Sequence, residues 1–223
     1  MQDVVLFGEG KIAEEVYWYF KADSDFNVVA FTADADYIQK DSLFGLPVRP
    51  FDSIVSEYPP DQVKMFVAQG YQDLNRLRTR KVAEVKSLGY SLVSYVSSRA
   101  SNMAAVPVGE NTLVLEHTTI QPLTKVGSNV FLWSGNHLGH HAEIEDNCYI
   151  AGHVVIGGNA VIGAGSLLGV NVTVGHNVHV GAGSIVGAGS LLTKSTEPGG
   201  VYIVKDTDRF RLDAEHFVKF TRM

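Results

Sequence analysis

The chain has 223 residues, of which 45% are hydrophobic and 19% are charged, so it has enough apolar material for a core and is not disordered. Its formal net charge is −6 and it has no run of Lys or Arg, which argues against a nucleic-acid partner held through backbone phosphates. A single cysteine, Cys148, excludes an internal disulfide framework. No apolar stretch reaches the ~18 residues that a membrane span needs, and no basic segment precedes the short apolar run near the start. We expect a cytoplasmic protein without a membrane partner.

Residues 1–100 alternate apolar runs with segments of helical periodicity. Ile12, Val16 and Phe20 recur at helical spacing, and a second helix is expected over 72–88. The apolar runs, which predict strands, cover residues 3–8, 27–34, 64–70 and 91–96. Alternation of strand and helix predicts a small parallel sheet of Rossmann type.

The first strand-to-helix turn contains Gly8 and Gly10 and is followed by Lys11. Glycine lets a backbone approach a phosphate at a helix N-terminus, where amide groups and the helix dipole favour an anion. The turn therefore predicts nucleotide binding, although any tight turn of this kind can use glycine. About 100 residues make only half of a dinucleotide fold, so a complete NAD cofactor is not expected.

Residues 106–195 have a different composition and repeat with a period of six. They contain fifteen of the 22 glycines and no arginine, and every sixth residue from Val108 to Leu192 is aliphatic. Three residues after each aliphatic position, Asn, Gly and His predominate, which tolerate a left-handed backbone. No helix has this period, so it predicts six-residue rungs with inward aliphatic side chains, three to an 18-residue coil. The segment then forms a parallel β-helix of about five coils, which serves as an enzyme or only as a scaffold.

These repeats, preceded by a truncated Rossmann-like region, resemble the hexapeptide-repeat acyltransferases that act on nucleotide sugars. The similar group contains the bacillosamine N-acetyltransferases and sialic-acid O-acetyltransferases, and it also shares the segments GLPVRPFDSI and FVAQG. The resemblance implies a left-handed β-helix. We expect a nucleotide-sugar-binding region over 1–100, the acyltransferase β-helix over 101–200, and a tail with a short helix over 201–223.

The resemblance also implies the reaction and the assembly. Acetyl-CoA is the expected co-substrate, and the acceptor is the amino group of a nucleotide-linked amino sugar, with a sugar hydroxyl as the alternative. Relatives are homotrimers that bind CoA between neighbouring subunits. Outward apolar residues on the flat sides of the prism, such as Phe131, Trp133 and Tyr149, favour a homotrimer here.

Among the histidines, His140 matches the position of the general base in this family. Relatives usually place a carboxylate directly after the base, but this chain has His141, which is also the second candidate for the base. Glu143, Glu145 or a residue of a neighbouring subunit is left to orient the imidazole. Gly158 follows His140 by 18 residues, or one coil, and matches the family position whose backbone N–H contacts the thioester carbonyl. His117, His141 and His153 fall in the left-handed corner position.

The remaining predicted contacts follow from the same resemblance. Tyr149 stands where relatives have a second histidine near the acyl group, while Cys148 is expected in the core rather than as a nucleophile. Asp34 and Asp36 follow the second strand, where relatives place acidic groups against the nucleotide. Ala164, Gly181 and Ala182 are expected along the pantetheine arm and Lys194 near the CoA phosphates.

A β-helical metal enzyme of the γ-carbonic anhydrase type is the rival interpretation. Two histidine pairs, His117 with His153 and His140 with His176, have the 36-residue spacing of two of its zinc ligands. The third ligand position is occupied by Gly158 or Gly181, so neither set reaches the three protein ligands of a catalytic zinc site. No metal is therefore expected.

Overall fold

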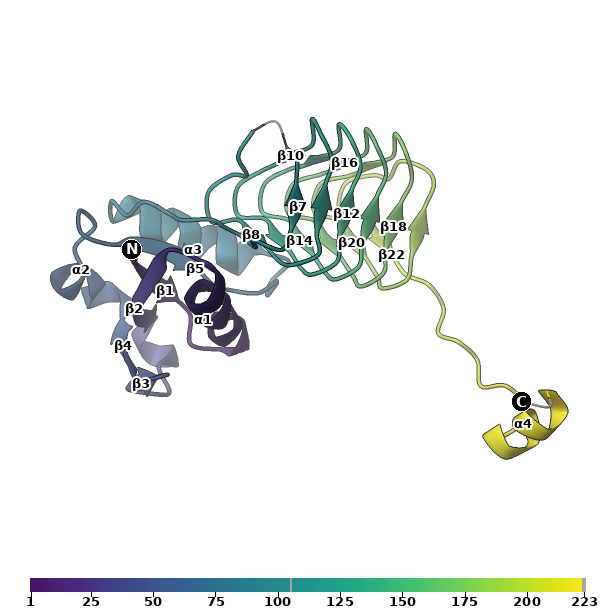
Figure 1. The fold of residues 1–223 in the computed structure, drawn as a ribbon, viewed down its shortest axis with the longest axis horizontal. Coiled ribbons are helices and arrows are strands. Elements are labelled where there is room, and N and C mark those ends of the chain that lie inside the picture. The colour runs from purple at the N-terminus through teal and green to yellow at the C-terminus, as the bar shows by residue number, and fades with distance from the viewer. Residues whose placement is uncertain (105, 222–223) are drawn as a thin grey trace.

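The computed structural model describes residues 1–104 and 106–221. A small sheet with its helices lies at one end of a prism of stacked coils, and a C-terminal segment extends from the other end (Figure 1). The expected α/β region followed by a parallel β-helix is confirmed.

The N-terminal sheet has five strands in the order β3-β4-β2-β1-β5. Its strands are β1 (Gln2–Phe7), β2 (Phe26–Ala33), β3 (Ser42–Leu43), β4 (Leu46–Pro50) and β5 (Lys64–Val67). All neighbours pair in parallel except β3 with β4. The strands expected over 3–8, 27–34 and 64–70 are thus present, with β1 between β2 and β5.

Two helices accompany this sheet. The first, α1 (Lys11–Asp23), buries Ala13, Val16, Tyr17 and Phe20, which is the apolar face expected from its spacing. The second, α3 (Arg76–Ser87), begins four residues later than expected because residues 73–75 all have left-handed backbone angles. It ends just before Gly89, which has a φ of 89°.

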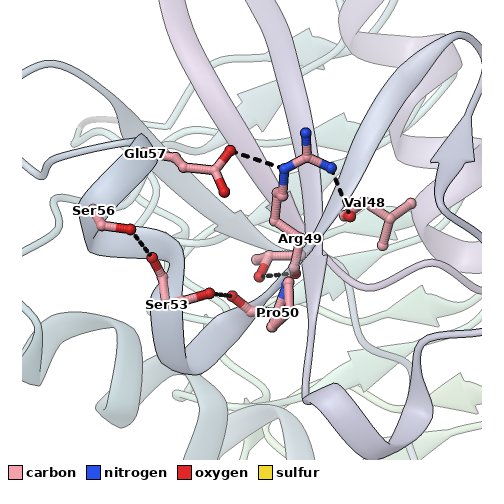
Figure 2. Close-up of polar contacts among 7 residues, drawn as sticks. Val48, Arg49, Pro50, Ser53, Ser56 and Glu57 are labelled. Atoms are coloured by element: carbon pink, nitrogen blue, oxygen red, sulfur yellow. Dashed lines mark hydrogen bonds and ion pairs between the residues drawn. The ribbon is translucent and has the colours of Figure 1, made fainter.

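The segment between β2 and β5 contains short elements that the sequence did not predict. They are η1 (Ala35–Tyr37), η2 (Phe51–Ser53) and α2 (Ile54–Glu57), together with β3 and β4. Local polar contacts hold this segment (Figure 2). Arg49 Nε donates to Glu57 Oε2 at 2.8 Å, and Ser56 Oγ donates to the carbonyl oxygen of Ser53 at 2.7 Å. Such short-range contacts leave little periodic pattern in a sequence.

Three parallel sheets form the sides of the prism, and each strand pairs with the strand 18 residues further on, as Phe131 does with Tyr149, except that the last pair, Ile185 with Val201, is 16 residues apart. The seven-stranded sheet contains β6 (Tyr95–Val96), β8 (Leu113–Val114), β11 (Phe131–Leu132), β14 (Tyr149–Ile150), β17 (Leu167–Leu168), β20 (Ile185–Val186) and β22 (Val201–Tyr202). The six-stranded sheet contains β7 (Ser101–Asn102), β9 (Thr119–Ile120), β12 (His137–Leu138), β15 (Val155–Ile156), β18 (Thr173–Val174) and β21 (Leu191–Leu192). The four-stranded sheet contains β10 (Lys125–Val126), β13 (Glu143–Ile144), β16 (Val161–Ile162) and β19 (His179–Val180).

The aliphatic residues of the repeat fill the interior of the prism, as expected, and the corners use left-handed residues. We call the corner between the seven- and six-stranded sheets the first edge. The corner between the six- and four-stranded sheets is the second edge, and that between the four- and seven-stranded sheets is the third edge. The left-handed residues are His117, Gly135, His153, Asn171 and Gly189 on the first edge, Leu123, His141, Asn159 and Asn177 on the second, and Asn111, Asn129, Asn147, Gly165 and Gly183 on the third.

One expected strand pairs differently. The run over 91–96 was predicted to join the N-terminal sheet, but only Leu92 forms a bridge there, with Met65. Residues Tyr95–Val96 are β6, which pairs with β8. The prism therefore starts directly after the bridge, with no separate linker.

Hydrogen bonds from a buried arginine and a cluster of aromatic rings join the N-terminal sheet and its helices to the prism. The Arg78 guanidinium is fully buried and donates to the side chain and carbonyl of Asn129 and to the carbonyls of Gly70 and Cys148. Phe66 of β5 stacks on Phe131 with ring centroids 5.8 Å apart.

The apolar residues expected on a free side of the prism are placed differently. Phe131, Trp133 and Tyr149 belong to the aromatic cluster beneath the N-terminal part, so the expectation that they lie on an open flat side is wrong. Large apolar side chains are exposed instead on the six-stranded sheet, where Val155 is 42% and Leu191 is 63% exposed.

The tail carries the short helix that was expected within residues 201–223. It forms α4 (Ala214–Thr221), none of whose side chains is buried, and lies away from the prism (Figure 1). Over the described ranges, none of the helices is long and apolar enough to cross a membrane.

Candidate functional site

A pocket of about 720 Å³ opens at the carboxyl ends of β1, β2 and β5, which is where parallel α/β sheets bind ligands. Three of the predicted nucleotide-binding residues, Gly10, Lys11 and Asp34, line it. Gly8 is not among the lining residues; a Cβ atom there would approach the Ala68 carbonyl oxygen to 2.9 Å and φ is 128°, so only glycine fits. The N-terminus of α1 has no side-chain cap, which leaves its first-turn amides for an anion.

The acidic residues after β2 separate in the structure. Asp34 accepts a hydrogen bond from Lys81 Nζ at 2.7 Å, and Lys81 also contacts Glu84. Burial alone lowers the pKa of Lys81, but these carboxylates outweigh it and raise the pKa, so the amine stays charged. Asp36 is exposed on η1 and does not line the pocket. The sequence did not predict Lys81, because a lysine on a charged helix face gives no sign of burial.

The second edge carries His140 and the residues that surround it. His140 is exposed, and its Nδ1 atom lies 3.1 Å from Nδ1 of His141. Its ring lies over Gly158 in the next coil: a Cβ atom on Gly158 would stand 2.8 Å from both Nε2 and Cε1 of the imidazole. His176, another coil further on, has its ring centroid 6.1 Å from that of His140. The predicted pair of His140 and Gly158 is therefore in contact.

The backbone N–H of Gly158 donates to no atom of the described chain. At two of the equivalent corner positions a side chain covers this amide: Gln121 accepts from His140 N–H, and Glu145 accepts from Ala164 N–H, each at 2.8 Å. The covering side chain comes from the position 19 residues earlier, and for Gly158 that position is Gly139. Because Gly139 has no side chain, the amide beside the His140 ring remains available to a ligand.

A second, apolar pocket of about 670 Å³ lies along the first edge and the seven-stranded sheet, under α1. It is lined by Ile12, Tyr71, Trp133, Ser134, Tyr149, Ala151, Gly152, His153, Leu167, Leu168, Gly169, Val170 and Ala188. Tyr149 is 7% exposed, and burial raises its pKa, so its hydroxyl stays protonated. Tyr71 packs edge-on against it with centroids 5.0 Å apart. The sequence predicted Tyr149 near the acyl group, but it did not predict Tyr71 here and it assigned Trp133 to a free side of the prism.

The predicted acyl-CoA contacts lie on different edges of one chain. Tyr149 lines the pocket on the first edge and Gly158 lies on the second, on the other side of the six-stranded sheet. Ala164 and Ala182 line a groove of about 810 Å³ on the third edge, opposite Arg76 and Arg80 of α3. Gly181 and Lys194 line neither that groove nor the apolar pocket. A single chain therefore does not bring the predicted acyl-CoA contacts together in one site.

Neither the cysteine nor the histidine pairs form a reactive centre of another kind. Burial raises the pKa of Cys148 to about 12, and its Sγ lies 3.3 Å from the Gly163 carbonyl oxygen, so the thiol is a core group. His117 and His153 lie on the first edge, whereas His140 and His176 lie on the second. Across the part of the chain that the structure describes, no group of three or more metal-ligating side chains is arranged to hold an ion.

Comparison with known proteins identifies the repeat. Residues 123–158 and 159–194 match the family described as bacterial transferase hexapeptide (six repeats). A search of curated protein sequences gave no match.

Solved structures extend the likeness to most of the chain. PerB from Caulobacter crescentus, solved with CoA and GDP-perosamine, is 25% identical with a TM-score of 0.79, over 90% of this chain and 93% of that one. The acetyltransferase domain of PglB from Neisseria gonorrhoeae FA1090 is 20% identical with a TM-score of 0.76, over 90% and 96% of the two chains. WeeI from Acinetobacter baumannii AYE is 22% identical with a TM-score of 0.65, over 90% and 96%. Residues 123–194 thus match the bacterial transferase hexapeptide family, and the chain has the Rossmann-like and left-handed β-helix fold of these solved structures.

Proposed function

We propose that the protein is an acetyl-CoA-dependent N-acetyltransferase that acts on the amino group of a nucleotide-linked amino sugar. The observation that carries this proposal is the contact between the His140 imidazole and Gly158, whose backbone N–H is free of any partner in the described chain. A base beside an unpaired amide is what acyl transfer needs, since one takes a proton while the other stabilises the oxyanion.

The acetyl group passes directly from CoA to the acceptor nitrogen. The acceptor nitrogen attacks the thioester carbonyl carbon and forms the new N–C bond, while Nε2 of His140 takes the proton that the nitrogen loses. The Gly158 N–H donates to the carbonyl oxygen as negative charge develops there. The C–S bond then breaks, and the proton passes from His140 to the sulfur, so that CoA leaves as the thiol.

The acceptor sugar nucleotide and the acetyl donor bind at separate sites. The pocket at the sheet, with its uncapped α1 N-terminus and Lys11, provides for the diphosphate of a nucleotide sugar. The similarity to PerB, a structure solved with CoA and GDP-perosamine, supports this pair of substrates. The likeness to the PglB domain, also solved with acetyl coenzyme A, supports the acetyl donor.

The arrangement of edges supports a homotrimer with shared sites. His140 on the second edge and the apolar pocket on the first edge flank the same six-stranded sheet, whose Val155 and Leu191 are exposed. When this sheet faces a threefold axis, the second edge of one copy meets the first edge of the next, and His140 reaches the neighbour's pocket. Donor binding then takes place between two copies.

The test is a panel of UDP-, GDP- and dTDP-linked amino sugars with acetyl-CoA, followed by thiol release and by mass spectrometry of the product. Each amino sugar is paired with the sugar that has a hydroxyl in place of the amine. We expect thiol release and one added acetyl group only with an amino sugar, and a raised melting temperature with its nucleotide. Acetylation of the hydroxyl partners would replace this proposal with O-acetyl transfer, and no transfer to any member of the panel would reject it.

A further inference from the structure

The group that orients the His140 imidazole is not a carboxylate of this chain's second edge. The two glutamates that follow His140 are engaged elsewhere. Glu143 Oε2 lies 3.5 Å from Lys125 Nζ on the neighbouring strand, and Glu145 Oε2 accepts the Ala164 N–H at 2.8 Å. Neither makes a hydrogen bond to His140, although a histidine base needs a partner on its second nitrogen to fix its tautomer.

His141 makes the contact that the glutamates do not. Its Nδ1 lies 3.1 Å from Nδ1 of His140, and the two rings stand nearly perpendicular, with an interplanar angle of 87°. The backbone of His141 is left-handed, with a φ of 59°. At 3.1 Å, one of the two nitrogens donates and the other accepts.

We propose that His141 is the positioning residue of the base: His140 Nδ1–H donates to the bare Nδ1 of His141. The proposal rests on the proposed function for its kinetic meaning. With Nδ1 protonated, the Nε2 atom of His140, above Gly158, keeps a lone pair for the acceptor's proton. The opposite direction of the bond would put the proton on Nε2 and leave no base at the amide.

A neutral histidine in this role behaves differently from a carboxylate. When His140 takes a proton at Nε2, its Nδ1–H bond to His141 persists, so no group needs to move. If His141 is itself protonated, it has two N–H donors and no acceptor, and the arrangement is lost. The titratable side chains along this corner and its flanking strands include His176, His137, His179, Lys125 and Glu143.

Three substitutions at residue 141 distinguish a role in orienting the His140 ring from a role in forming the turn. Asn159 and Asn177 hold the same left-handed place one and two coils later, and glycines hold it on the other edges, so Asn and Gly both suit this turn. The Oδ1 atom of Asn or Asp stands as far from the backbone as Nδ1 of His. Thus His141→Gly removes the acceptor, His141→Asn keeps a neutral acceptor, and His141→Asp supplies a charged one.

The expected kinetics follow from these differences. His141→Gly lowers kcat about 10–100-fold with little change in KM, and His141→Asn recovers most of that loss. In His141→Asp, the negative partner favours imidazolium, so the acid limb of kcat/KM moves to higher pH by about one unit. The matched control is His117→Gly, a left-handed histidine on the first edge, which should leave kcat unchanged.

The decisive readout needs no substrate. Nitrogen-15 NMR of the histidine-labelled protein reports which ring nitrogen carries the proton. We expect His140 protonated at Nδ1 and bare at Nε2, with this tautomer lost in His141→Gly. A His140 protonated at Nε2 in the unaltered protein would overturn the proposal, as would equal kcat in all three variants and the parent. Failure of the acetyl-transfer panel alone would reject the proposed function and leave the tautomer result standing.

Discussion

Gly158 shows how a single missing side chain shapes the candidate site. Its backbone angle is not left-handed, and Ala164 and Ala182 occupy the same corner position elsewhere, so glycine is not required by the turn. What glycine provides here is space, because a Cβ atom would stand 2.8 Å from the His140 ring. The imidazole and the free amide can therefore lie together only when residue 158 has no side chain.

We predict that Gly158→Ala preserves the fold but lowers kcat. The methyl group displaces the His140 ring from the amide, and misplacement of a catalytic group by about 1 Å costs about 10²-fold. Melting temperature should stay close to that of the parent, since alanine is accepted at this corner. Steady-state kinetics with the best substrate of the panel measures the effect. An unchanged kcat would show that the ring and the amide do not act together.

The 18-residue period of the sequence is enough to predict that His140 lies beside Gly158. The same period could not predict the bond between His140 and His141, because it fixes which face a residue occupies and not the rotation of its ring. The sequence also did not predict that Lys81 and Arg78 are buried, because a basic residue on a helix rich in charged residues is ordinarily exposed. Only the side-chain geometry therefore shows that His141 is the hydrogen-bond partner of His140 Nδ1.

Among the elements, α3 does most to join the sheet to the prism. Arg78 donates to carbonyls from both parts, and its guanidinium lies over the Phe131 ring at 4.4 Å. Burial lowers its pKa to about 10, so it remains charged at neutral pH. Asn75 Nδ2, at the start of the same helix, donates to the Gly165 carbonyl at 3.1 Å. These contacts fix where the pocket at the N-terminal sheet lies relative to the edges of the prism.

We predict that Arg78→Met destabilises the protein by about 2–3 kcal/mol, because a methionine fills the volume but leaves buried carbonyl acceptors without donors. Arg78→Lys should recover only part of this loss, since an ammonium cannot reproduce the planar fork. Denaturant unfolding at a fixed protein concentration measures both. The exposed Arg80→Met, on the same helix, is the control. Equal midpoints for parent and Arg78→Met would contradict a structural role.

A second contact between the N-terminal part and the prism, made by Asp23, depends on pH. Hydrogen bonds from Ser98 and Tyr95 hold the pKa of Asp23, at the end of α1, well below its usual range. A carboxyl whose pKa is lowered by folding adds stability above its unfolded value of about 3.9, and that stability is lost as pH falls toward the folded value. Asp23 therefore stabilises the protein at neutral pH through its ionised form.

We predict that Asp23→Asn lowers the melting temperature at pH 7 and that the difference from the parent shrinks as pH falls below about 4. Asn cannot supply the charged acceptor at either pH, so only the parent changes. Melting curves from pH 7 to pH 3 measure this. A difference that is the same at all pH values would show that the charge of Asp23 does not contribute.

Hydrophobic periodicity was sufficient to predict the elements with a regular pattern. Strands β1, β2 and β5, helix α1 and the stacked rungs all follow from it. The run over 91–96 was assigned to the wrong sheet because its apolar pattern suits either partner, and pairing with β8 is decided by the neighbouring coil. The late start of α3 follows from three consecutive left-handed residues, which no periodic pattern encodes.

For the whole molecule, the prism determines where a complete site can form. Each chain has the proposed base, His140, on its second edge and an apolar pocket on its first, and the six-stranded sheet lies between the two edges. The sequence predicted the β-helix and the trimer but assigned free apolar residues to a side that the N-terminal part covers. That error arises because a repeat describes one coil at a time, whereas packing of the N-terminal part depends on the whole chain.

The most direct test of the central claim is acetyl transfer by mixed trimers. One parent is His140→Ala, whose kcat should fall about 10²–10⁴-fold for want of a base. The other is Val170→Trp, which fills the first-edge pocket at a corner residue that is 46% exposed and therefore tolerant of a larger side chain. Refolded together, the two inactive proteins should regain about a quarter of the parent's activity, because random closed trimers then pair an intact His140 with an intact pocket. Mixed trimers that form but remain inactive, or a His140→Ala protein with near-normal turnover, would contradict the account.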